Sequence, residues 1–174
     1  MSAQVGDGNK MANGDEEILV EPRVLGLYHV NINVSSLERS RRFYELFGFR
    51  VVDRFNEKNN ANLDRGLGLP PEMGSENHAL FMMVGDSRHA TVLDMCEWIH
   101  PRSEARNAPP AVNDLGIPRI CLRVKHLDHL ILQLKEKGVA FVTDEPQCLH
   151  TLDRQPRFIL CRDPDGIMVE LVEL

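Results

Sequence analysis

The sequence contains an internal repeat that constrains the possible fold more than any other feature. When the chain is compared with itself at an offset of 90 residues, matching residues recur without a gap: Gly26, Val34, Leu37, Gly48 and Val52 match Gly116, Val124, Leu127, Gly138 and Val142. Each copy begins with alternating apolar and polar residues, which is typical of a strand with one buried face. A helical pattern follows and ends at a glycine. We therefore predict two copies of one structural unit.

Both copies are predicted to follow the order β-α-β-β-β. Ser35 is expected to be the N-cap of the first helix, with Glu38 completing a capping box. After each helix, further strands are expected at 49–55, 78–84 and 91–98 in the first copy, and at 139–143, 157–161 and 167–174 in the second. The closing strands match at an offset of 76, so the first copy is 14 residues longer. We place this excess in 56–77, which is expected to be a functional loop or lid.

The repeat also predicts the domain organisation. A unit of about 60 to 75 residues is marginally stable alone, so the two modules, about 24–99 and 115–174, are expected to share one core within a domain spanning 23–174. Residues 1–22 are rich in Gly, Asn, Asp and Glu and are predicted to form a flexible acidic tail. The predicted fold class is α+β, with two tandem βαβββ modules.

Composition excludes several classes of function. The net charge of −6 argues against a sequence-independent nucleic-acid binder, which needs a basic surface. No apolar run approaches the roughly 20 residues of a membrane span, so no membrane partner is expected. The four cysteines contain no C-x-x-C pair and are predicted to stay reduced in the cytoplasm: Cys96, Cys121, Cys148 and Cys161. A small molecule is the expected partner.

Two further features carry a family resemblance. A histidine, His29, follows Leu-Tyr in the opening strand, and the sequence Asp-Pro-Asp-Gly at 163–166 is followed by Glu170. Together with the duplicated architecture, these features resemble the vicinal-oxygen-chelate superfamily, which includes glyoxalase, methylmalonyl-CoA epimerase, the extradiol dioxygenases and the bleomycin- and fosfomycin-resistance proteins. The resemblance covers 24–174. It implies two modules that curl into an open barrel around a curved cavity, and a homodimer.

The resemblance also implies a metal site. In the superfamily, four positions in the first and last strands of the modules hold a divalent ion, and the matching residues here are His29, Asp94, Arg119 and Glu170. His29, Asp94 and Glu170 are suitable ligands for Fe, Mn, Ni, Co or Zn. Arg119 stands where the superfamily has a histidine, and a guanidinium has no lone pair to donate. Glu97 is an alternative to Asp94.

Two functions therefore remain open. The first is a glyoxalase-like, metal-dependent lyase or isomerase that acts on a small carbonyl-containing molecule, with Glu170 moving the proton. The second is a metal-free member in which Arg119 clamps an anionic ligand, either as a resistance-type binder or as an acid–base enzyme. The residues that share strand parity with His29 and Arg119 are predicted to form the substrate-binding walls: Asn31, Asn33, Cys121 and Arg123.

Overall fold

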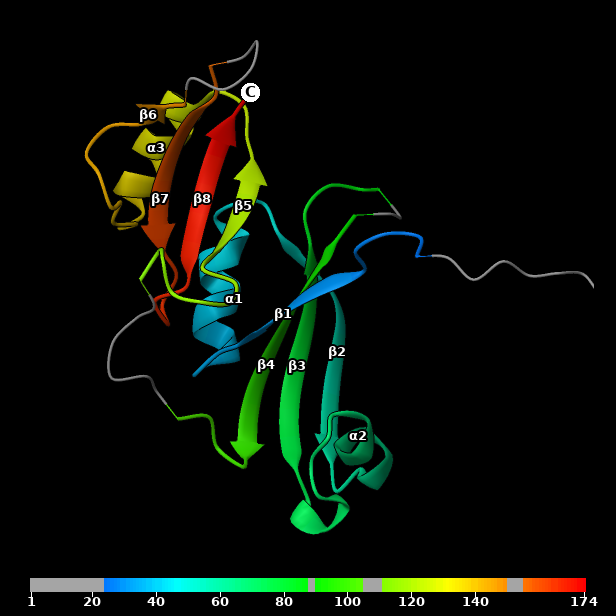
Figure 1. Ribbon diagram of the computed structural model, residues 1–174. Helices are drawn as coiled ribbons and strands as arrows, with labels where there is room; N and C mark the ends of the chain where they lie inside the picture. The colour runs from blue at the N-terminus through cyan, green and yellow to red at the C-terminus, as the bar shows by residue number, and fades with distance from the viewer. Residues whose placement is uncertain (1–23, 88–89, 105–110, 150–154) are drawn as a thin grey trace, which may run out of the picture.

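The computed structural model describes residues 24–87, 90–104, 111–149 and 155–174, so the predicted tail at 1–22 lies outside the described residues. Two βαβββ modules follow one another, each built on a four-stranded sheet (Figure 1). This architecture confirms the predicted α+β class and the tandem duplication. In the described ranges, no helix is long and apolar enough to cross a membrane.

The first module has the strand order β1-β4-β3-β2, with β1 parallel to β4 and the other pairs antiparallel. Its main elements are β1 (His29–Asn33), α1 (Leu37–Glu45), β2 (Arg50–Lys58), β3 (Glu76–Met83) and β4 (Val92–His100). The predicted loop at 56–77 is shorter than expected, because β2 and β3 both extend into it. Its tip holds α2 (Ala61–Gly66) and the 3₁₀ turn η1 (Pro71–Met73), at the end of the sheet farthest from the second module (Figure 1).

The second module has the equivalent order β5-β8-β7-β6. Its elements are β5 (Arg119–Arg123), α3 (Leu127–Glu136), β6 (Gln147–Cys148), β7 (Arg157–Arg162) and β8 (Met168–Glu173). The strand predicted at 139–143 is wrong, because only Phe141 pairs there, as an isolated bridge to Cys161. The segment turns away after that bridge, and Pro146 has no backbone N–H with which to extend a ladder. The two-residue β6 takes the place of the predicted strand.

One hydrophobic core joins the modules. Fully buried side chains come from both of them, with Tyr44, Met82 and Met95 from the first and Leu127, Leu134 and Leu171 from the second. In Figure 1, α1 lies between the two sheets.

The turn between β7 and β8 provides a polar connection to α1. The Tyr44 hydroxyl donates to Asp163 at 3.1 Å, and both groups are buried. Asp165 in the same turn accepts from the Ser35 backbone N–H at 3.0 Å and from Arg39 at 2.8 Å. Ser35 is thus engaged between modules, and the predicted N-cap is off by one residue. Ser36 caps α1 instead, by accepting from the Arg39 backbone N–H at 3.4 Å.

The helix starts repeat the duplication in detail. The Glu97 carboxylate accepts from the Leu37 backbone N–H at 2.9 Å, and Glu173 accepts from that of Leu127 at 3.2 Å. The two leucines are matched by the offset of 90 and the two glutamates by the offset of 76. The last strand of each module therefore satisfies a donor in the first turn of its own helix. This contact places Glu97 on the helix side of its sheet.

Candidate functional site

The first half of the candidate site lies on β1 and β4, on the face of the sheet that turns away from α1. We call this side of each sheet its open face. Asn31 is level with Asp94 in the parallel ladder and donates to its carboxylate at 2.9 Å. The Cys96 thiol lies 3.6 Å from the same carboxylate, and burial, together with the Asp94 charge, raises its pKa to about 11. Asp94, rather than Glu97, therefore occupies the open face.

The second half lies on the equivalent strands, β5 and β8. The Arg119 guanidinium donates through Nε to the Glu170 carboxylate. Glu170 is buried, whereas 45% of the Arg119 side chain is exposed. Cys121 is level with Glu170, and burial, then the nearby Glu170 charge, raises the thiol pKa to about 11. Arg119 is therefore ion-paired with the carboxylate at the equivalent position of its own sheet.

The other predicted residues lie around these two pairs. The exposed His29 ring is 6.0 Å from the Phe81 ring, centroid to centroid. Asn33 accepts from the Trp98 indole at 3.0 Å. Arg123 is exposed on β5, two residues beyond Cys121, and has no ion pair within the described part of the chain.

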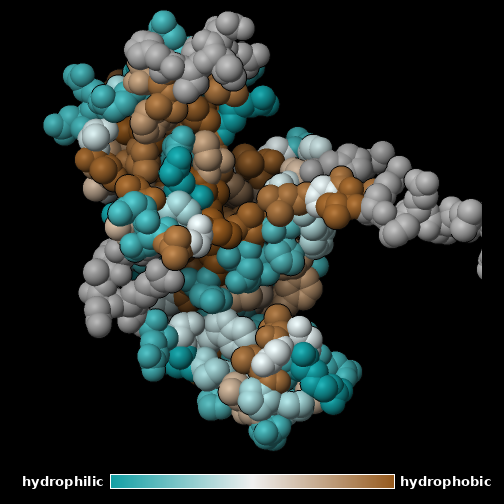
Figure 2. Space-filling model, viewed as in Figure 1, coloured by the Kyte–Doolittle hydropathy of each residue, from teal (hydrophilic) through white to brown (hydrophobic). Residues whose placement is uncertain are grey.

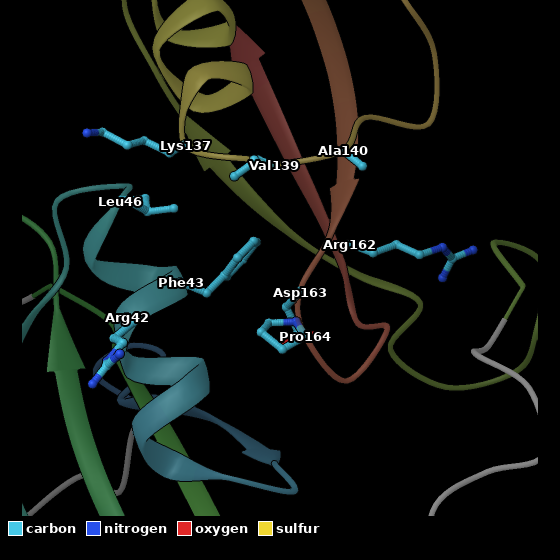
Figure 3. Close-up of a pocket in the computed structure, with 10 residues that line it drawn as sticks. Arg42, Phe43, Leu46, Lys137, Val139, Ala140, Arg162, Asp163 and Pro164 are labelled. Carbon is cyan, nitrogen blue, oxygen red and sulfur yellow. The ribbon is translucent and has the colours of Figure 1, made fainter.

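Two hollows border the junction of the modules. A cavity of about 1070 Å³ lies where the end of β1 meets the segment before β5, and its lining includes Asn33, Trp98 and Ile117. Figure 2 shows hydrophobic residues gathered between the modules above a largely hydrophilic face of the lower one. A cleft of about 500 Å³ opens between α1 and the second module (Figure 3). There the Phe43 ring faces inward while Lys137 and Arg162 point away, and no predicted site residue lines it.

Comparison with known families identifies the superfamily that has this duplicated arrangement. The model of the Glyoxalase/Bleomycin resistance protein/Dioxygenase superfamily matches residues 26–171. The chain belongs to this superfamily. The match spans both half-sites, from before β1 to the end of the buried part of β8. No curated protein gives a significant match to the chain.

Solved structures of glyoxalase-superfamily proteins have the same fold. A glyoxalase family protein from Bacillus cereus has a TM-score of 0.74 and 22% identity, covering 89% of this chain and 97% of that one. Glyoxalase I of Leishmania major, described as trypanothione-dependent, has a TM-score of 0.57 and 20% identity, covering 85% and 86%. A fosfomycin resistance protein from Listeria monocytogenes, complexed with Mn(II) and sulfate, has a TM-score of 0.55 and 14% identity, covering 87% and 94%. At these identities the likeness establishes the fold alone.

The superfamily relationship makes a metal the obvious expectation, but the side chains do not fit one within a single chain. Among the described residues, no group of three or more His, Cys, Asp or Glu side chains is arranged to hold an ion. His29 and Asp94 lie on one sheet, and Glu170 lies on the other, bound to Arg119. A guanidinium about 4 Å from a divalent ion would be repelled by roughly 8 kcal/mol at an effective dielectric of 20. The described part of one chain therefore does not bring the three predicted ligands together, and the metal site stays a prediction.

Sequence reasoning missed the aromatic part of the first half-site. Phe81 is level with Asp94 in the β3–β4 ladder. The ring of Phe55 on β2 packs against the Phe81 ring, with centroids 4.7 Å apart. Tyr28, just before β1, also contacts the Phe81 ring, at 6.4 Å. Residues 79–83 form a continuous apolar run, so no alternation in the sequence marks the face on which Phe81 lies. The register that sets it beside Asp94 is a tertiary feature.

Proposed function

We propose that this superfamily member binds a small anionic, carbonyl-containing molecule through Arg119, without a metal ion held by His29, Asp94 and Glu170. The observation that carries the proposal is the ion pair between Arg119 and Glu170, at two of the four positions where the superfamily places its metal ligands. The metal-dependent lyase or isomerase remains the competing prediction, and the experiments below separate the two.

The geometry of Arg119 suits an anion. Its Nε is engaged by Glu170, and its terminal nitrogens make no hydrogen bond to any described residue. A guanidinium presents these donors as a planar fork that matches a carboxylate or phosphate. The pairing with Glu170 fixes the orientation of the fork, and its 45% exposure leaves the fork accessible. Arg123, on the same face of β5, adds a second positive charge for the ligand.

A second candidate function, acid–base catalysis, follows from the position of Glu170. An anion held by Arg119 would place its neighbouring carbon close to a buried carboxylate. Glu170 could then accept a proton from that carbon while the guanidinium stabilises the negative charge that develops. Burial and the Glu170 charge raise the pKa of the Cys121 thiol to about 11, which favours the protonated thiol over the nucleophilic thiolate at neutral pH.

We further propose a cytoplasmic homodimer. β1 and β5 are edge strands in the described sheets, and each follows an exposed apolar segment. Leu25 and Leu27 before β1 are 87% and 66% exposed, and Ile117 before β5 is 77% exposed, with Leu115 fully exposed. A second copy would cover these segments and bring open faces together. The four cysteines are all unpaired, which supports a reducing compartment.

The first experiment measures anion binding after chelation. Protein treated with EDTA is titrated calorimetrically with pyruvate, phosphate and sulfate. We expect saturable binding of at least one anion, a loss of at least tenfold in affinity in Arg119→Gln, and a smaller loss in Arg119→Lys, which keeps the charge but not the fork. Arg54→Gln removes an exposed arginine from β2 and is the matched control. Binding that requires added metal would overturn the proposal.

The second experiment restores the usual histidine. In Arg119→His, we expect weak anion affinity whether or not Mn, Co, Ni or Zn is supplied, because the fork is gone. Elemental analysis of the wild-type protein and of this variant accompanies the titration. If the variant takes up stoichiometric metal and gains metal-dependent activity on a carbonyl compound, the ligand set is complete in solution. The metal-dependent function would then be preferred.

A further inference from the structure

An aromatic cluster occupies the open face of the first sheet, beside Asp94. We call Tyr28, His29, Phe55 and Phe81 the aromatic shelf. Phe81 is at its centre, with ring centroids 4.7 Å from Phe55, 6.0 Å from His29 and 6.4 Å from Tyr28. Tyr28 is 68% exposed and the two phenylalanines are half-buried, so the shelf is accessible to a ligand.

The charges around the shelf are negative. Asp94 and Asp53 are both level with Phe81 in their ladders, on either side of it. The Asp94 carboxylate is bound by an amide and a thiol, and Asp53 by a backbone N–H, so neither has a cationic partner among the described residues. Arg50, level with Met83 at the end of β2, is paired with Asp86. The shelf therefore combines aromatic rings with two carboxylates that lack a counter-ion.

We propose that the aromatic shelf binds an organic cation, such as a quaternary or protonated amine. The faces of aromatic rings attract cations through their quadrupole, and the contact strengthens where water is excluded. The half-buried Phe81 ring lies next to the buried Asp94 carboxylate, so a cation there would be attracted both by the ring face and by the negative charge. An anion would instead be repelled by the two carboxylates. The negative charge beside the shelf therefore favours a positively charged ligand.

The shelf also narrows the substrate class of the proposed function, on which this step rests. The open face of the second sheet presents Arg119 and Arg123, whereas that of the first presents Asp94 and Asp53. In the proposed homodimer, which would bring open faces together, a ligand that bridges them would need an anionic end for the arginines and a cationic end for the shelf. A small zwitterion carries both of these groups.

The test compares three benzyl probes of similar size and different charge: benzyltrimethylammonium, benzyl alcohol and benzoate. Binding is followed by NMR titration of the full chain. We expect benzyltrimethylammonium to bind more tightly than benzyl alcohol, with benzoate absent from the shelf. Phe81→Leu should weaken the affinity for the cation by about 2- to 30-fold, which corresponds to the usual strength of a cation–π contact. Asp94→Asn should also weaken it and leave benzyl alcohol unchanged.

Controls separate binding from folding. Phe43→Leu makes the same change in the α1 cleft and should leave the affinity for the cation unchanged. Tyr28→Leu alters an exposed ring, so it tests the shelf with little risk to folding. Equal affinity for the cation and the alcohol, or a cation affinity unaffected by Phe81→Leu, Tyr28→Leu and Asp94→Asn, would overturn the proposal. Arg119→Gln should weaken anion binding at least tenfold yet leave the ammonium probe bound, so the two proposals can fail separately.

Discussion

The buried contact between Tyr44 and Asp163 should be a major source of cohesion between the modules. Tyr44 has no exposed surface, Asp163 is 5% exposed, and their hydrogen bond connects α1 to the β7–β8 turn. Tyr44→Phe keeps the ring and removes only the hydroxyl. One Asp163 oxygen still accepts from the Asp165 and Ile167 backbone N–H groups, at 2.9 and 2.8 Å. The other oxygen loses its partner.

The stability lost in Tyr44→Phe should depend on pH. Burial raises the pKa of Asp163, and the Tyr44 hydroxyl opposes that rise. The native state therefore binds more protons than the unfolded chain between the ordinary carboxyl pKa of about 4 and the raised native value, so stability falls as pH rises through this window. Tyr44→Phe raises the native pKa further. We expect a loss of about 2 kcal/mol at pH 8, where a charged acceptor is left unpaired, and a smaller loss at pH 4.

Urea unfolding followed by Trp98 fluorescence measures this loss, because the chain has one tryptophan. The melting temperature should fall by roughly 4 to 8 °C at pH 8 for a domain of this size. All measurements use one protein concentration, since dimerisation would add to stability. Tyr28→Phe removes a hydroxyl from a ring that is 68% exposed and should change stability by less than about 0.5 kcal/mol. A loss of that small size in Tyr44→Phe, equal at both pH values, would refute the reasoning.

Three further predictions address other parts of the fold. Asp165→Asn should cost about 1 to 2 kcal/mol in urea unfolding, because a charged acceptor between the modules is lost. Glu97→Ala and Glu173→Ala should each cost about 1 kcal/mol and lower helix content by circular dichroism; a cost for only one would contradict their equivalence. Alkylation of Cys96 and Cys121 by iodoacetamide, followed by mass spectrometry, should be slow at pH 8 and rise steeply towards pH 11, because burial raises both pKa values to about 11.

The duplicated architecture could be read from local patterns because each module repeats the same local requirements. Gly48 and Gly138 match at the offset of 90, and both adopt a positive φ, 83° and 85°, just after their helices. Such a backbone conformation favours glycine at a helix end. Prediction from the sequence was less accurate where contacts between residues far apart in the chain decide the local structure. Ser35 is used by Asp165, 130 residues away, so the adjacent Ser36 became the cap.

The sequence by itself determined the two modules, their order of elements and the polar residues that alternate along β1 and β5, because strand and helix periodicities are properties of neighbouring residues. Only the tertiary structure decided which of these polar groups meet. Asp94 lies with Asn31 and the aromatic shelf, whereas Glu170 lies with Arg119. Strand register and the packing of one sheet relative to another set these encounters, and both depend on contacts between distant parts of the chain.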